Sequence, residues 1–108
     1  MSDDLERGIM VFRMRSDKEA IRTMAFQVAM LTTQCTKDNI KIIDCLVSFG
    51  GTKSVISEIS RLKDRKDFDY VLLYSPKNVC STPMEYRGFV SEIKKRGLGL
   101  RVLKLDLE

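Results

Sequence analysis

The sequence contains no histidine and no tryptophan, and it has only two prolines and three cysteines among its 108 residues. Without histidine, the chain lacks the usual general base near neutral pH and the commonest ligand for transition metals. Cys35, Cys45 and Cys80 are odd in number and widely spaced, so they predict neither a disulfide framework nor a zinc site. We therefore expect no metal, no cofactor and a cytoplasmic location.

Long apolar runs are also missing. No stretch approaches the roughly 18 residues that a membrane span needs, and residues 1–8 form a polar leader without the apolar region of a signal peptide. The 19 Lys and Arg against 15 Asp and Glu give a net charge of +4, spread along the chain rather than gathered in one basic stripe. These features predict no membrane contact and at most weak contact with DNA.

What the sequence does contain is the composition of one globular domain over 1–108, with 44% hydrophobic and 31% charged residues. Apolar and β-branched runs predict strands at 9–12, 40–47, 69–74 and 98–107. Helices are predicted between them, at about 17–36, around 55–62 and from Pro83 to Gly97. This order predicts a three-layer αβα fold with a mostly parallel sheet of four to five strands.

The core of each predicted helix follows from its apolar spacing. Steps of three and four residues define one apolar stripe on each helix. In the first helix the stripe is Ala20, Met24, Val28, Leu31 and Cys35; in the second it is Val55, Ile56, Ile59 and Leu62; in the third it is Met84, Phe89, Val90 and Ile93. Met10, Met14, Met24, Met30 and Met84 could form an adaptable binding surface, but most of them have core spacing and are expected to fill gaps in the core.

A functional site is expected at the carboxyl ends of the strands, where three loops carry hydroxyl and cationic side chains. Each loop leads into a helix N-terminus, which favours an anion. The candidate residues are Arg13, Arg15, Ser16, Lys18, Ser48, Lys53, Lys77, Asn78 and Ser81. The alternative interpretation is that the hydroxyls are helix caps and that the lysines form a solvated rim. No Walker or dinucleotide glycine motif is present.

Several segments resemble the catalytic domain of serine recombinases, the resolvase and invertase family. Residues 12–16 read Phe-Arg-Met-Arg-Ser, similar to the family's opening Tyr-x-Arg-x-Ser, and Ser16 matches its nucleophile. Gln27 corresponds to a frequent family glutamine, and residues 48–51 stand where the family has Ser-Gly. The order of segments 68–74 and 92–103 carries the strongest similarity. The resemblance implies a resolvase-like fold and an ancestor that cut and rejoined DNA through a phosphoserine link.

The sequence departs from the family at the arginines. Met14 replaces the arginine of the opening motif, Asn78 and Ser81 replace the two arginines of the catalytic loop, and Lys53 is at best the fourth cation. Strand alternation directs Arg13 and Arg15 to the face opposite Met14. A doubly negative transition state needs preorganised cations, and losing one commonly costs about 10²–10³-fold in rate. The resemblance therefore implies a scaffold without efficient strand cleavage.

Three functions follow as hypotheses. The first is a pseudoenzyme that acts through protein–protein contact or self-association, as a bacterial or prophage-encoded regulator of a recombinase or another DNA-associated protein. The second is an active recombinase domain that cleaves and rejoins DNA through Ser16 with an unusual set of cations. The third is a sensor of a small phosphate or nucleotide at the loops that follow the strands.

Overall fold

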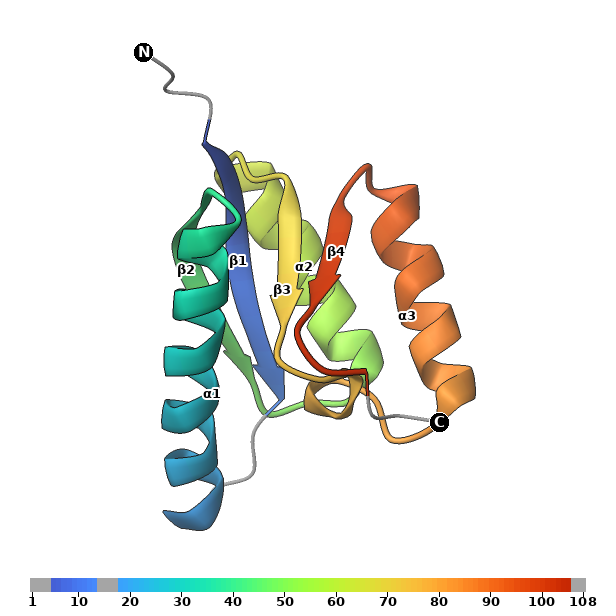
Figure 1. The fold of residues 1–108 in the computed structure, drawn as a ribbon. Coiled ribbons are helices and arrows are strands. Elements are labelled where there is room, and N and C mark those ends of the chain that lie inside the picture. Colours follow the sequence, from blue (N-terminus) through green and yellow to red (C-terminus); the bar gives the residue numbers. More distant parts are fainter. Residues whose placement is uncertain (1–4, 14–17, 106–108) are drawn as a thin grey trace.

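The structure, a computed structural model, describes residues 5–13 and 18–105. Its elements are β1 (Glu6–Arg13), α1 (Lys18–Lys37), β2 (Ile40–Ser48), α2 (Thr52–Arg65), β3 (Tyr70–Leu73), the 3₁₀ turn η1 (Pro76–Asn78), α3 (Pro83–Lys95) and β4 (Gly99–Val102). The four strands form one parallel sheet in the order β2-β1-β3-β4. Figure 1 shows α1 and α2 on opposite sides of this sheet. The predicted αβα fold with a parallel sheet is confirmed.

Alternate residues of the central strands face two separate cores. Ile9 and Val11 of β1 pack with α2 and α3, in a cluster that includes Ile59 and Phe89. Phe12 and Met10 pack with Leu72 on the other side of the sheet, under α1. Because both faces of β1 are covered, its apolar run is continuous, as expected for a strand in the middle of a parallel sheet.

Two predicted boundaries are wrong. The first strand is predicted at 9–12, after a polar leader over 1–8, but β1 begins at Glu6, and residues 6–8 pair with residues 40–42 of β2. Strand pairing uses the backbone, so polar side chains at the end of a strand do not prevent it. The last strand is predicted over 98–107, but β4 spans Gly99–Val102, and the next two residues only donate backbone hydrogen bonds to Leu73 and Tyr74. Residues 106 and 107 lie outside the described residues.

Two of the methionines expected in the core are exposed instead. Met30 of α1 is 43% exposed, and Met84 at the start of α3 is 79% exposed. Met10 is buried and Met24 packs at the edge of the core under α1. Met14 lies outside the described residues. Met84 sits in the first turn of α3, ahead of the buried residues Phe89 and Ile93, which explains why helical spacing alone overestimated its burial.

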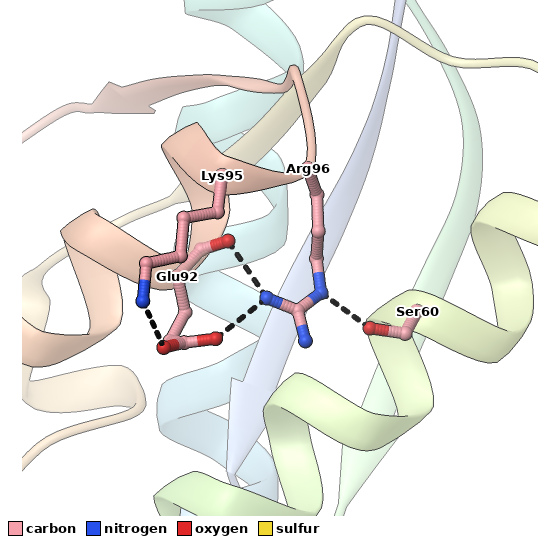
Figure 2. Close-up of polar contacts among 4 residues, drawn as sticks. All are labelled: Ser60, Glu92, Lys95 and Arg96. Carbon is pink, nitrogen blue, oxygen red and sulfur yellow. Dashed lines mark hydrogen bonds and ion pairs between the residues drawn. The ribbon is translucent and has the colours of Figure 1, made fainter.

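The end of α3 is tied to α2 by a polar network (Figure 2). Arg96 donates from Nη1 to the backbone oxygen and to Oε1 of Glu92, each at 2.8 Å, and from Nε to Oγ of Ser60 in α2. Lys95 also donates to Glu92, at 3.3 Å. Gly97 follows with φ of +73°, the left-handed conformation in which glycine commonly ends a helix. The predicted cationic last turn and glycine stop are confirmed, and Arg96 has a structural role.

Candidate functional site

The carboxyl ends of β1, β2 and β3 lie at one end of the sheet, together with η1 (Figure 1). Three segments meet there: the end of β1 at Arg13, the β2–α2 connection from Ser48 to Thr52, and the loop from Ser75 to Thr82. Thr52 Oγ1 donates to the backbone oxygen of Val79 at 2.9 Å, which ties the start of α2 to that loop. The loop 75–82 therefore has a defined position at this end of the sheet.

Asn78 is held by hydrogen bonds on both ends of its amide. Its Oδ1 accepts from the backbone N–H of Ser75 at 2.8 Å, while the Ser75 hydroxyl accepts from the Lys77 N–H, so the two residues form a capping box around η1. Its Nδ2 donates to Oε1 of Gln27 in α1 at 2.8 Å. Asn78 thus fixes the loop locally and also connects it to α1, which lies 51 residues earlier in the chain.

Arg13 is the cation that reaches this loop. Its Nη2 donates to Oγ of Ser81 at 3.1 Å, and the backbone N–H of Ser81 donates to Oε1 of Glu85 at 2.9 Å. Arg13 follows Ile9 and Val11 on the side of the sheet covered by α2 and α3, so strand alternation brings its guanidinium to the start of α3. The guanidinium of Arg13, a residue of β1, thus places a positive charge next to Ser81 of the loop.

Ser48 is used inside the protein. It is 1% exposed, its hydroxyl donates to Oε2 of Glu58 at 2.6 Å, and it accepts from the N–H of Gly50 at 3.3 Å. A Cβ on Gly50 would lie 2.6 Å from the Ser54 side chain, so this tight connection requires glycine. Ser48 is therefore a structural residue of the β2–α2 connection rather than a group turned toward a ligand.

Cys80 lies in the same loop and is 1% exposed. Burial raises the pKa of its thiol to about 11, so the sulfur stays protonated at neutral pH. Since the thiolate is the reactive form, Cys80 is unsuited to nucleophilic chemistry. Among the described residues, no cluster of Cys, Asp and Glu side chains has the arrangement of a metal site.

The structure brings together only some of the predicted site residues that it describes. The structure brings Arg13 to Ser81, and it leaves Lys53 and Lys77 exposed on α2 and η1. Arg15 and Ser16 lie outside the described residues, and the same is true of the Lys18 side chain. A groove of about 500 Å³ between α2 and α3 is lined by Lys53 but also by Glu85 and Glu92, and these carboxylates disfavour a phosphate there.

Sequence reasoning missed three partners at this site, namely Thr52, Glu58 and Glu85. Their contacts span 27, 10 and 4 residues of sequence. The capping box of η1 does have a local signal, because Ser75 is followed three residues later by a side chain that can bond back to it. The alternative interpretation of the hydroxyls as caps holds for Ser75 and Thr82, whose side chains accept from backbone N–H groups of the following helices.

Comparison with solved structures finds several similar chains. The structure is similar to the C-terminal catalytic domain of ISC1926 TnpA, an IS607-like serine recombinase, with a TM-score of 0.71 and 16% sequence identity. The match covers 91% of this chain and 70% of the other. The chain has the serine recombinase fold. No protein-family model matches the sequence, and neither does the sequence of any curated protein.

This fold agrees with the resemblance of the sequence to serine recombinases. In this chain the fold is a parallel sheet with the loop 75–82 at the carboxyl ends of its strands. At 16% identity, however, the likeness is one of fold, and the chemistry has to be argued from the residues themselves. Within the described residues, none of the helices is long and apolar enough to cross a membrane.

Proposed function

We propose that this chain is a recombinase-fold domain that does not cleave DNA and that acts through contact with another protein. The observation that supports the proposal is the hydrogen bonding of Asn78, which matches the position of an arginine in the serine recombinase family. Both ends of its amide are engaged, with Ser75 and with Gln27, at 2.8 Å each. A neutral side chain used in this way contributes no charge to a phosphate transition state.

The proposed partner is a recombinase or another DNA-associated protein, and the proposed setting is regulation in a bacterium or prophage. Support for this choice comes from the fold, which in the similar protein belongs to a serine recombinase, and from the spread of the +4 net charge, which is too dilute for a dedicated DNA-binding surface. The cytoplasmic location stays a prediction from the sequence.

The alternative, an active recombinase domain, has one specific observation in its favour. Arg13 places a guanidinium 3.1 Å from the Ser81 hydroxyl, and Ser81 matches the second arginine of the family's loop. If a phosphate bound beside Ser81, the Arg13 guanidinium could supply part of the positive charge that the family's arginines provide. This arrangement makes Arg13 the residue whose removal most directly tests the alternative.

Covalent capture of DNA distinguishes the two functions. The full chain is incubated with nicked duplexes of random sequence, and protein–DNA adducts are sought on denaturing gels. We expect no adduct with the wild-type chain and none with Ser16→Ala or Arg13→Ala. An adduct formed by the wild type and abolished by Ser16→Ala would overturn the proposal, and its reduction by about 10²-fold or more in Arg13→Ala would assign the cation.

The protein contact is tested separately. The chain is mixed with a serine recombinase encoded in the same genome, and the mixture is followed by sedimentation velocity. A faster-sedimenting complex that contains both proteins is the expected result. Sedimentation of the two as independent species at about 100 µM, well above the range of most specific complexes, would contradict the proposed partner.

A further inference from the structure

The strand β2 forms one edge of the sheet (Figure 1). Among the described residues, β1 is the only strand that pairs with it, although β2 is nine residues long. The outer side of an edge strand has a row of backbone N–H and C=O groups that can pair with a strand of another molecule. The strand at the other edge, β4, has only four residues. The outer edge of β2 is therefore where this sheet most needs protection against unwanted strand pairing.

The sequence of β2 increases this need. It reads Ile-Lys-Ile-Ile-Asp-Cys-Leu-Val-Ser and contains neither proline nor glycine. Short segments with high strand propensity, low charge and no proline are the ones that assemble into intermolecular sheets. Within residues 42–48 the only charged side chain is that of Asp44. One carboxylate thus stands in the middle of a segment that is otherwise well suited to pairing.

The ladder between β1 and β2 is irregular at this residue. Pairing advances by one residue on β1 while it advances from Ile42 to Asp44 on β2, so Ile43 is the extra residue of a β-bulge. Oδ1 of Asp44 accepts a hydrogen bond from the backbone N–H of Cys45 at 2.8 Å. An N–H that is bonded to a side chain of its own strand is not open to a strand added from outside.

Asp44 is held in this position by the residue that follows α2. Lys66 donates from Nζ to Oδ2 of Asp44 at 2.8 Å. The hydrogen bonds from Lys66 and from the Cys45 backbone lower the pKa of the Asp44 carboxyl, so it is charged at neutral pH. The side chains of Lys66 and Asp44 are 46% and 35% exposed, and an ion pair this open to water adds little to stability. Its main effect is to keep a charged, partly solvated group in the middle of β2.

We propose that Asp44 protects the outer edge of β2 against pairing with a strand of another molecule. An added strand would have to displace the carboxylate from the Cys45 N–H, follow the irregular backbone at Ile43 and remove part of a charge from water. A bulge and a charged side chain are both devices that protect the edges of natural sheets, and here they occur together. The inference goes beyond the proposed function, because it holds whether or not the chain cleaves DNA or binds a recombinase.

The experiment compares Asp44→Ala with Asp64→Ala, which removes an exposed carboxylate from α2 and gives the same net charge. Each full chain is incubated at about 100 µM and neutral pH, and assembly is followed by thioflavin fluorescence and by sedimentation. A reductant is present because Cys45 is exposed. We expect assembly to be at least about 10-fold faster in Asp44→Ala than in the wild type, and unchanged in Asp64→Ala.

Two further variants separate the effect on the edge from a loss of stability. Asp44→Ala combined with Cys45→Lys returns a charge to an exposed position of β2 without restoring the hydrogen bond of Asp44, and it should assemble as slowly as the wild type. Asp44→Asn keeps the oxygen that accepts from Cys45 but loses the charge, so an intermediate rate is expected. This variant carries the comparison if thermal unfolding shows that Asp44→Ala does not fold.

Two results would overturn the proposal. The first is an equal rate of assembly in Asp44→Ala and Asp64→Ala, which would show that the position of the carboxylate does not matter. The second is a double variant that assembles as fast as Asp44→Ala while unfolding at the same temperature, because a charge returned to β2 would then have no effect at the edge.

Discussion

The two sides of the sheet are covered by helices of different character. On one side lie α2 and α3, in which six of 14 and five of 13 residues are charged. On the other side lies α1, which has a single charged residue between positions 20 and 36. The inner stripes of all three helices are apolar, so helical periodicity does not distinguish them. The difference lies on the outer surfaces, where α2 and α3 carry many charged side chains and α1 exposes Ile21, Phe26 and Met30.

The largest expected loss of stability tests the core between the sheet and helices α2 and α3. Phe89→Ala removes a side chain with 0% exposure from the core under α2 and α3, and we expect unfolding to become easier by about 3–5 kcal/mol. Urea denaturation measures this change. The control is Met84→Ala on the same helix, where 79% exposure limits the expected change to about 0.5 kcal/mol. Equal effects from the two variants would contradict the assignment of that core.

A smaller effect tests the packing under α1. A Cβ on Gly8 of β1 would lie 2.8 Å from Cδ1 of Leu72, which is itself fully buried. Because this core has no room for another methyl group, Gly8→Ala should cost about 1–3 kcal/mol in thermal or urea unfolding. Gly88→Ala in α3 is the matched variant, since its Cβ meets open space, and it should add about 0.5–1 kcal/mol through helix propensity. A neutral Gly8→Ala would mean that the core under α1 is loosely packed.

The link between α1 and the loop 75–82 is tested at Asn78. Asn78→Ala removes the cap of η1 and the bond to Gln27, and we expect a loss of about 1–2 kcal/mol in stability. Asn78→Asp keeps the oxygen that accepts from Ser75 but loses the amide donor to Gln27. The aspartate variant should therefore fall between the wild type and the alanine variant in urea unfolding. A loss as large as that of Asn78→Ala would place the whole effect on Gln27.

The remaining effect is a pH dependence on the α2 and α3 side, which is absent at neutral pH. Burial raises the pKa of Cys80 from 9.0 to about 11, so the folded state favours the neutral thiol. The stabilisation is complete below pH 9 and is lost as the pH rises through 11, by up to about 3 kcal/mol in total. Urea unfolding of the wild type and of Cys80→Ala at pH 8 to 11 isolates this contribution. Parallel pH profiles for the two proteins would contradict it.

Much of the fold was predictable because its signals are local. The apolar run of β1, the stripe of α2 and the Thr82-Pro83 start of α3 lie within single segments, and each was found at the predicted place. The boundaries at residues 6–8 and at Val102 were not predicted, because the ends of a strand depend on pairing with segments distant in the sequence. The candidate loops were also predicted, although the burial of Ser48 and its bond to Glu58 were not.

The sequence by itself determined the order of elements, the parallel αβα arrangement and the inner faces of the helices, since chain geometry ties these features to periodicity over a few residues. Only the tertiary structure decided that Asn78 bonds to Gln27, that Arg13 reaches Ser81 and that Phe26 and Met30 stand in solvent. Those contacts join residues 51 and 68 positions apart, and the exposure depends on the absence of a second layer over α1 within the described chain. Neither can be read from local spacing, because the contacts depend on how distant segments meet and the exposure depends on what packs against α1.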